Sequence, residues 1–323
     1  MARHKRRTRD FCVSVNRMAR RMLGARRSKV PWLAGCLLLA TLPGAVLAEA
    51  GPPPAIRRIC IEVSDKAGEA VTGLDAQSFD VTLAGRPAAV SVVVEDAPLS
   101  VMVLLDVSYP ALPHQDALKR SLDRFAGDLR PQDEMAVRVY GATTALLFPF
   151  SSDHLDSRRK ALSHQIQAVA ANQSHLWDGL AAAIKAVSGR KGRRAVIVFT
   201  NGYDSGSKTL RQDAVDAAWR AGVRIDFIHT PRPSRWSGGF WRQQISQLDG
   251  AAGDTGGTVR KVRDSEELQP AFRLLAARLM KGYCLEFTGF AADIGAKLAK
   301  ARVKTETKGA RVMGPSRVAA GEN

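Results

Sequence analysis

Three short polar segments carry side chains whose types and spacing could do chemistry. They are Asp106-Val107-Ser108-Tyr109-Pro110, Asn172-Gln173-Ser174-His175-Leu176-Trp177-Asp178 and Thr200-Asn201-Gly202-Tyr203-Asp204. The first and third each follow an apolar run, and the second precedes a helical pattern. A hydroxyl, an imidazole and a carboxylate, here Ser108, His175 and Asp178, are the residue types of a nucleophilic triad. A hydrolase is therefore one class of function to weigh.

The sequence lacks the local patterns that usually accompany catalysis. It has no Gly-x-Ser-x-Gly turn, and His175 and Asp178 are three residues apart at one helix start, a spacing typical of capping or packing. Asp254-Thr255-Gly256 is similar to an aspartic protease triplet, but it occurs once and is explained as a turn before a strand. Phosphate-binding, zinc and dinucleotide motifs are also missing. We predict that the protein is not an enzyme, with a hydrolase as the less favoured alternative.

Strand and helix patterns alternate between Leu99 and Lys281. Apolar runs, typical of strands covered on both faces of a parallel sheet, occur at 100–105 and 195–200, and two more strands are predicted at 223–229 and 258–262. A further strand is predicted at 135–140, with a hairpin partner at 145–150. Apolar residues at helical spacing predict helices over 118–129, 155–169, 176–187, 210–221, 240–251 and 268–279. Asp264 and Glu267 have the spacing of a capping box before the last helix. The alternation predicts a doubly wound, mostly parallel α/β sheet.

Shorter strand patterns flank this region on both sides. They lie at 58–64, 79–83 and 89–95 before it, and at 283–287 and 299–306 after it. Each block is too small to bury a face alone, so we predict that the two blocks complete one β-sandwich with the α/β domain inserted between them. The predicted boundaries are 57–97 and 282–313 for the sandwich, 98–281 for the α/β domain and 314–323 for a tail. In such a sheet, function lies at the carboxyl ends of the strands.

On these features the chain resembles the von Willebrand factor type A (VWFA) family, specifically exported bacterial proteins in which that domain is inserted in a β-sandwich. The resemblance covers roughly residues 57–312. It rests on the apolar strand into Asp106-x-Ser108, the strand into Thr200-Asn201-Gly202, and Asp254-Thr255-Gly256-Gly257 before the last strand. The resemblance implies a Rossmann-like fold and a role in binding.

The family's metal-ion-dependent adhesion site holds Mg²⁺ with an Asp-x-Ser-x-Ser loop, a distant Thr and a distant Asp, and a partner's carboxylate completes the shell. Asp106 and Ser108 match this pattern, but Pro110 stands at the second Ser position. Ser174 falls at the Thr position and Asn201 at the Asp position. Mg²⁺ requires a shell of oxygen ligands. Compared with the family pattern, this chain lacks one hydroxyl and one negative charge. The resemblance implies a degenerate site, with either no cofactor or weakly bound Mg²⁺.

The loops at the same end of the sheet are rich in Tyr, Trp and Arg, the residue types that dominate protein–protein hot spots. The candidate rim consists of Tyr109, His175, Tyr203, Arg232, Arg235 and Trp236. Trp177 and Trp241 either join this rim or pack inward as helix core. We predict that the rim binds an unidentified protein partner, with an Arg replacing the attraction of a metal for acidic groups. The alternative is a Mg²⁺-dependent adhesion domain that binds carboxylates.

Cys60 and Cys284 lie in two similar strand patterns, 59–63 and 283–287. In each, apolar residues face one side, while the cysteine shares the other, outer face with a glutamate. A lone cysteine on a solvated strand face is unusual, whereas two on paired strands are explained by a bond between them. We predict a Cys60–Cys284 disulfide, with two unrelated free thiols as the alternative.

The formal net charge of +17 is concentrated at the start of the chain. Residues 1–48 hold eleven of the 48 Lys and Arg and one of the 31 Asp and Glu, which leaves +7 for the remainder. An apolar stretch over 32–47 follows the basic run and ends in Val46-Leu47-Ala48, a pattern typical of a secretory signal peptide. At roughly 16 residues, it is shorter than the ~20 of a spanning helix.

We therefore predict a signal peptide over 1–48, a linker over 49–56 and export to the periplasm or the exterior. An uncleaved N-terminal anchor is the alternative, and it is the one membrane contact expected. The remaining +7 is spread over many segments, and the basic residues between Lys297 and Lys308 are interpreted as a solvated strand face. We expect no nucleic acid partner.

Overall fold

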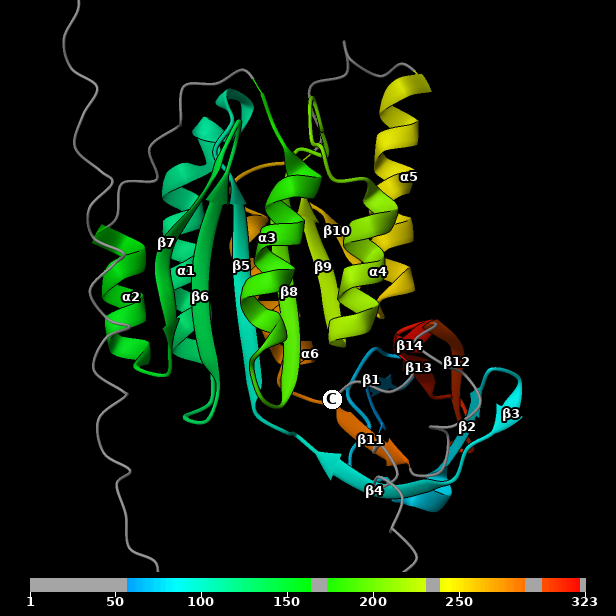
Figure 1. The fold of residues 1–323 in the computed structure, drawn as a ribbon. Coiled ribbons are helices and arrows are strands. Elements are labelled where there is room, and N and C mark those ends of the chain that lie inside the picture. The colour runs from blue at the N-terminus through cyan, green and yellow to red at the C-terminus, as the bar shows by residue number, and fades with distance from the viewer. Residues whose placement is uncertain (1–56, 164–172, 231–238, 288–297, 320–323) are drawn as a thin grey trace, which may run out of the picture. The chain divides into compact units, whose positions relative to one another are not determined.

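A computed structural model describes residues 57–163, 173–230, 239–287 and 298–319. Its centre is a six-stranded sheet of order β10-β9-β8-β5-β6-β7, in which β7 alone runs antiparallel to its neighbour (Figure 1). The strands are β5 (Leu99–Asp106), β6 (Glu134–Tyr140), β7 (Thr144–Ser151), β8 (Arg193–Thr200), β9 (Val223–His229) and β10 (Val259–Lys261). All residues of β5 are buried, because helices cover the sheet on both faces.

Two apolar clusters separate the sheet from these helices. On one face lie α1 (Gln115–Asp128) and α6 (Leu268–Leu279), and on the other lie α3 (Leu176–Ser188), α4 (Arg211–Ala221) and α5 (Gly239–Asp254). The short helix α2 (His154–Ser163) contacts α1. The predicted doubly wound α/β fold is therefore confirmed. Residues 164–169 of the predicted second helix lie outside the described residues.

The predicted capping box before α6 is wrong. The helix begins at Leu268, and the Asp264 carboxylate instead accepts hydrogen bonds from the backbone N–H groups of Glu266 (3.0 Å) and Glu267 (3.2 Å). A capping box would require the Glu267 carboxylate to accept from the Asp264 N–H. It accepts instead from the N–H of the preceding residue, Arg263 (2.8 Å). Asp264 therefore closes the turn that leads into the helix.

Two four-stranded sheets, β13-β1-β11-β4 and β14-β12-β2-β3, enclose a third apolar cluster. Their strands are β1 (Arg57–Ser64), β2 (Phe79–Leu83), β3 (Arg86–Pro87), β4 (Val90–Glu95), β11 (Tyr283–Phe287), β12 (Leu298–Thr305), β13 (Arg311–Met313) and β14 (Arg317–Ala319). Because β11 lies between β1 and β4, and β12 pairs with β2, strands from before and after the α/β domain form one β-sandwich, as predicted. Residues 317–319, which the sequence prediction placed in the tail, form β14 of this sandwich.

The α/β domain occupies the place of a hairpin loop. Strands β4 and β11 are antiparallel neighbours, Tyr283 lies opposite Glu95, and the Asp96 N–H donates to the Gly282 carbonyl (2.8 Å). On the other side of β11, Cys60 lies opposite Cys284, and the two form a disulfide across 224 positions of sequence. The chain thus leaves and re-enters the sandwich at adjacent points.

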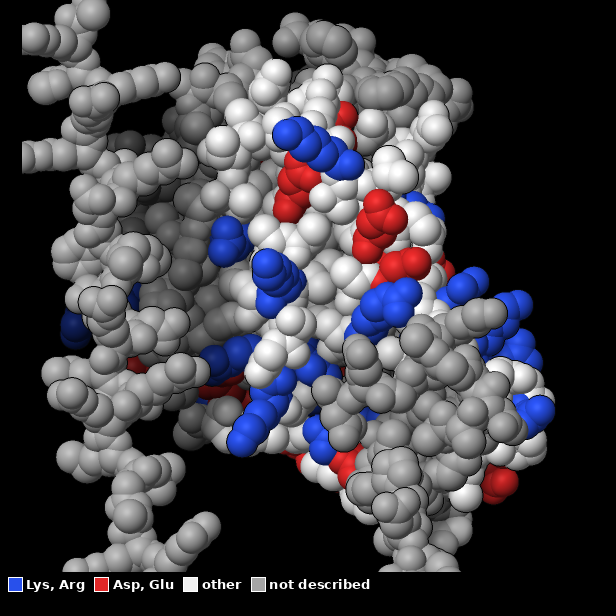
Figure 2. All heavy atoms as spheres, in the orientation of Figure 1, with Lys and Arg blue, Asp and Glu red and all other residues white. Residues whose placement is uncertain are grey.

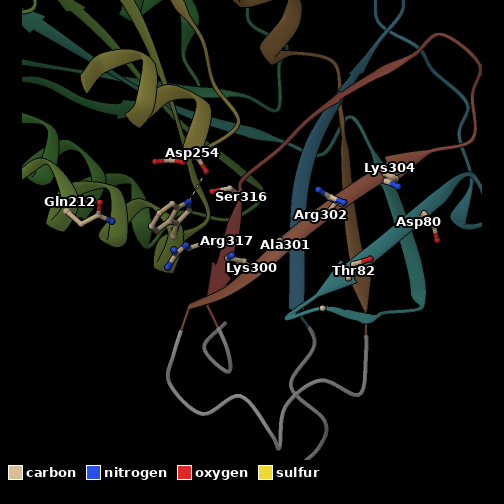
Figure 3. Close-up of a pocket in the computed structure, with 12 residues that line it drawn as sticks. Asp80, Thr82, Gln212, Asp254, Lys300, Ala301, Arg302, Lys304, Ser316 and Arg317 are labelled. Atoms are coloured by element: carbon tan, nitrogen blue, oxygen red, sulfur yellow. Dashed lines mark hydrogen bonds between the residues drawn. The ribbon is translucent and has the colours of Figure 1, made fainter. Parts of the chain in front are cut away.

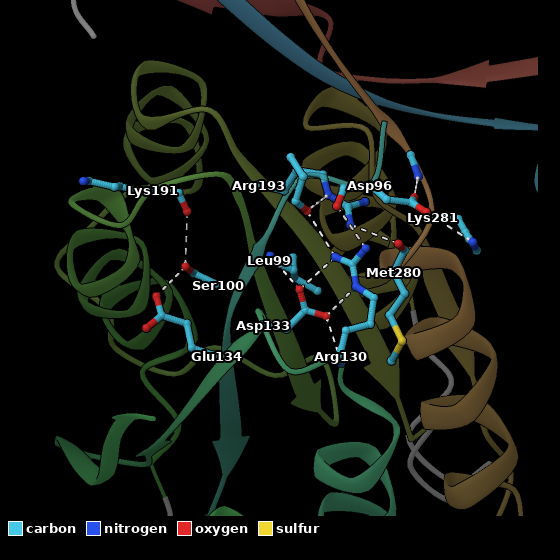
Figure 4. Close-up of polar contacts among 12 residues, drawn as sticks. Asp96, Leu99, Ser100, Arg130, Asp133, Glu134, Lys191, Arg193, Met280 and Lys281 are labelled. Carbon is cyan, nitrogen blue, oxygen red and sulfur yellow. Dashed lines mark hydrogen bonds and ion pairs between the residues drawn. The ribbon is translucent and has the colours of Figure 1, made fainter. Parts of the chain in front are cut away.

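Two arginines bind the backbone where the chain leaves and re-enters the sandwich (Figure 4). The Arg130 guanidinium donates to the carbonyls of Asp96 (3.0 Å) and Ala97 (3.1 Å) and pairs with the buried Asp133 carboxylate (2.8 Å). Arg193 donates to the Ala97 carbonyl (2.9 Å) and to that of Met280 (3.1 Å). Both connections between the sandwich and the α/β domain are therefore held by arginine hydrogen bonds.

The face of β1 that carries Cys60 and Glu62 was predicted to be solvated, and at Glu62 this prediction is wrong. Glu62 is 4% exposed and accepts hydrogen bonds from Arg224 of β9 (2.7 Å) and Arg278 of α6 (2.7 Å). This face of the sandwich is turned toward the α/β domain, so its carboxylate is matched by that domain's cations.

No helix within the described ranges is both long and apolar enough to cross a membrane.

Candidate functional site

Polar side chains gather where β5 and β8 end. Asp106 is the last residue of β5 and Asn201 directly follows β8, and since the two strands are parallel neighbours, their carboxyl ends meet at one edge of the sheet. Ser108 and Ser174 lie in loops at the same edge, and all four side chains are buried, at 3% exposed or less. The candidate metal residues are thus inside the protein.

The Asn201 amide bridges two of these residues. Its Nδ2 donates to Asp106 Oδ2 (3.1 Å) and to Ser108 Oγ (3.4 Å). Its Oδ1 accepts from the Tyr203 N–H (2.9 Å), which fixes the end of the amide that faces Asp106. The other carboxylate oxygen, Asp106 Oδ1, accepts from the Ser108 N–H (2.8 Å). An N–H₂ group therefore stands between the carboxylate and the hydroxyl.

Burial dominates the electrostatics of this cluster. It raises the pKa of the Asp106 carboxyl, and the hydrogen bonds from Ser108 oppose that rise. Burial, followed by the charge of Asp106, raises the pKa of the fully buried Tyr140 hydroxyl well above its usual value. Tyr140 donates to the Thr200 hydroxyl (2.9 Å), which also accepts from the Gly202 N–H (2.9 Å). Hydrogen bonds within the chain thus engage the Asp106 carboxyl, the Asn201 amide and the Tyr140 hydroxyl.

These residues do not fit a divalent cation. Mg²⁺ requires a shell of oxygens, whereas here an amide N–H₂ points at the two oxygens, from Asp106 and Ser108, that the family pattern assigns to the metal. Among the described residues there is no group of three or more His, Cys, Asp or Glu side chains that could hold a metal. Ser174 Oγ is buried and has no hydrogen-bond partner in the described structure. One such hydroxyl does not supply the missing charge.

Two surface loops beside the cluster are joined to each other. The Asp204 carboxylate accepts from the Leu176 N–H (2.8 Å), and the Ser207 hydroxyl accepts from the N–H groups of Trp177 (3.0 Å) and Asp178 (3.2 Å). In return, Asp178 accepts from the N–H groups of Lys208 (3.0 Å) and Thr209 (2.8 Å). The start of α3 and the loop after β8 therefore form one braced platform.

Sequence reasoning missed the roles of Asp204, Ser205 and Ser207. Ser205 Oγ accepts from the Ser174 N–H (2.8 Å), so all three residues tie the loop to the start of α3. A sequence signal was present, because closely spaced small polar residues after a strand are typical of loops that bond to backbone groups.

The imagined nucleophilic set of Ser108, His175 and Asp178 is not assembled. His175 Nδ1 lies 4.0 Å from Asp178 Oδ2, but that carboxylate serves the backbone of the 208–209 loop. In the described structure, Ser108 Oγ accepts a hydrogen bond from the Asn201 amide, which cannot act as a base.

The structure describes only part of the predicted rim. His175 and Tyr203 are half-buried on the platform, and Tyr109 begins a short 3₁₀ helix (Tyr109–His114), where its side chain is not described. Arg232, Arg235 and Trp236 lie outside the described residues, as does the side chain of Trp241. Trp177 is 5% exposed and packs in the core beneath α3, so of its two predicted placements the inward one is found.

The α/β domain has a sheet of order β10-β9-β8-β5-β6-β7, an antiparallel edge strand β7, and a polar cluster where β5 and β8 end. This α/β domain has a von Willebrand type A-like fold. No family model matches the chain, and no curated protein matches its sequence. Solved structures do resemble this α/β domain.

Three of these structures illustrate the similarity, which concerns the fold alone. BatB from Bacteroides thetaiotaomicron is 15% identical, over 55% of this chain and 97% of its own, with a TM-score of 0.45. The von Willebrand factor domain of the type V pili tip protein Mfa5 from Porphyromonas gingivalis is 12% identical, over 56% and 94%, with a TM-score of 0.45. Proximal thread matrix protein 1 from the mussel byssus, with a zinc-occupied adhesion motif, is 15% identical, over 58% and 49%, with a TM-score of 0.46.

Proposed function

We propose that this chain is an exported, non-enzymatic protein-interaction module that binds its partner without a metal, through the loops at the carboxyl ends of the sheet strands. The observation that carries this proposal is the Asn201 amide, which donates to both Asp106 (3.1 Å) and Ser108 (3.4 Å). The amide supplies from within the chain the positive partner that the carboxylate needs. The loops at 106–108 and 201–203 can therefore keep their shape in the absence of a cation.

The braced platform supports binding because its loops are held by backbone hydrogen bonds before a partner arrives, which lowers the entropy cost of association. Arg232 and Arg235 would supply attraction for acidic groups, and Trp236 an aromatic anchor. A Mg²⁺-dependent adhesion domain is the second candidate, and the unpartnered hydroxyl of Ser174 favours it. The Cys60–Cys284 disulfide supports export, since such bonds persist in oxidising compartments.

The decisive experiment compares the wild-type full chain with Asn201→Asp in EDTA, Mg²⁺ and Mn²⁺. We expect thermal unfolding of the wild type to be the same in all three and titration with either metal to give no heat. Asn201→Asp places a second buried carboxylate against Asp106, so its melting temperature should fall in EDTA and recover with metal. Asn201→Ala is the control: it should lose about 1–3 kcal/mol of stability that no metal restores.

The same proteins then serve for partner capture. Wild type should retain its partner from extracts of its native cells equally in EDTA and in Mg²⁺, and Arg235→Ala with Trp236→Ala should lose it. Heat on titrating the wild type with Mg²⁺, together with capture that EDTA abolishes, would establish the Mg²⁺-dependent alternative instead.

A further inference from the structure

A groove of about 610 Å³ lies between the β-sandwich and the von Willebrand type A-like domain, away from the site described above (Figure 3). One wall is the outer face of β12 with its neighbours β2 and β14, and the other is formed by α4 and the end of α5. The lining includes Asp80, Trp219, Lys300, Arg302, Lys304 and Arg317. Figure 2 shows Lys and Arg side chains gathered on the side of the surface where Figure 1 labels β2 and β12.

The basic side chains on β12 form a regular row. Ala299, Ala301 and Val303 pack into the sandwich core, so Lys300, Arg302 and Lys304 project from the opposite face, where all three are exposed. Alternate residues of a strand are about 6.4–6.8 Å apart along its axis. The groove therefore presents three cations at a repeat set by the strand itself.

The cross-strand neighbours of this row offer one acidic side chain for three bases. Lys300 lies directly opposite Arg317 of β14, and like charges at opposed positions of a sheet are destabilising. Asp80 lies opposite Lys304, and Thr82 opposite Arg302. For the three bases of β12, the described structure records no ion pair. An anionic ligand would relieve the repulsion.

Arg317 is held in position from behind. Its guanidinium lies 5.1 Å from the centre of the Trp219 ring, a cation–π contact. The Trp219 indole N–H donates to the Asp254 carbonyl (2.8 Å), which also accepts from the Ser316 N–H (2.8 Å). A cation fixed in this way loses little conformational freedom when it binds an anion.

We propose that this groove binds an extended acidic segment of a partner protein, with Asp or Glu at every second residue. An extended peptide has the same two-residue repeat as β12, so three successive carboxylates can face Lys300, Arg302 and Lys304 together. Its backbone N–H groups supply donors for Asp80 and Asp254, whereas a polyphosphate has no donor and would be repelled by both. This second surface is independent of the loops in the proposed function.

Nucleic acid fits the groove less well. Single strands bind through exposed aromatic side chains on which bases stack. Trp219 is 5% exposed and its ring faces Arg317, so it offers no such platform.

The test uses the full chain and two fluorescent peptides of one composition, an alternating Glu-Thr repeat and a block of Glu followed by a block of Thr. Fluorescence anisotropy should show at least about fivefold tighter binding of the alternating peptide. Replacing Lys300, Arg302 and Lys304 by Glu should weaken that binding at least about tenfold. The control replaces the exposed Arg120, Arg159 and Arg273 by Glu, which changes the net charge equally, and should leave binding within about twofold.

Lys300→Glu alone separates binding from folding. Since it replaces a like-charged pair with Arg317 by an opposite one, we expect the melting temperature to hold or rise while peptide binding falls. The proposal would be overturned by equal affinity for the two peptides or by an equal loss of binding in the control. It would also be overturned if a polyphosphate or an oligonucleotide bound more tightly and the β12 variant abolished that binding. Arg235→Ala with Trp236→Ala should leave peptide binding unchanged, so failure here is distinct from failure at the rim.

Discussion

At the scale of single residues, His229 links the candidate site to pH. Its side chain is 2% exposed, its Nε2 lies 3.2 Å from the Asn201 carbonyl, and its Nδ1 has no partner in the described structure. Burial lowers the pKa of His229 below its ordinary 6.5, although the Asn201 carbonyl opposes this. Burial also lowers the pKa of His114. Both imidazoles are therefore neutral in the folded chain at a pH where the unfolded chain binds protons.

The sign of the resulting pH dependence follows from these shifts. The stability that depends on neutral His229 and His114 is complete above the unfolded pKa of 6.5 and is lost as the pH falls through the lower folded values. The free energy of unfolding, measured with denaturant from about pH 7 to about pH 5, should fall in the wild type and fall less in His229→Gln. A slope unchanged when both histidines are replaced by Gln would contradict this assignment.

The sequence predicted which residues would meet at the site, but not how they would interact. Asp106, Ser108 and Asn201 could be placed together because each lies at or just after the end of one of two adjacent parallel strands. The direction of the Asn201 amide could not be predicted, since it depends on the backbone N–H of Tyr203. That single contact turns the amide N–H₂ group, and not its oxygen, toward Asp106 and Ser108.

At the scale of elements, Glu62 joins strand β1 to the von Willebrand type A-like domain. It pairs with Arg224, which also pairs with the buried Asp226, and with Arg278. Glu62→Gln should lower the free energy of unfolding by about 3–5 kcal/mol, because it leaves two partly buried guanidinium groups without their shared carboxylate.

The matched control is Glu286→Gln on β11, whose partner Arg58 is 42% exposed. An exposed pair contributes about 0–1 kcal/mol, so the two variants should differ clearly in denaturant unfolding. Equal losses would mean that burial of the Glu62 pairs adds nothing.

Periodicity was sufficient to predict the strands and helices that pack in a core, but not the contacts between domains. Alternation along β1 distinguishes its two faces correctly, yet it does not tell which face meets another domain and which meets water. Glu62 was therefore predicted to be solvated although it is buried. The same limit applies to Asp264, where a capping-box spacing is present but the helix begins later.

At the scale of the molecule, the position of the insertion predicts that the β-sandwich can fold without the α/β domain. Asp96 and Gly282 are already hydrogen-bonded across the two strands that the insertion interrupts. Replacing residues 97–281 by Asn-Gly should close an ordinary hairpin between β4 and β11. We expect the shortened chain to fold with the Cys60–Cys284 disulfide intact, as measured by circular dichroism and by the absence of titratable thiol from these two cysteines.

The insertion itself was predictable, because incomplete strand patterns flank a complete α/β pattern. The register was not, since no side chain in 90–95 or 283–287 specifies that β4 and β11 are neighbours. An unfolded or oxidation-resistant shortened chain would show that the sandwich needs the contacts of Glu62 with the α/β domain.

The disulfide also determines how the molecule carries mechanical force. When the two ends of the chain are pulled apart, tension passes along the backbone to Cys60, crosses the sulfur–sulfur bond and leaves through Cys284. Residues 61–283 form a loop closed by this bond, so tension along the covalent path bypasses them and reaches them through non-covalent contacts such as the pairing of β1 and β2 with β13 and β12. The backbone of the von Willebrand type A-like domain thus lies outside the covalent path of the force, and reduction of this one bond would place it within that path.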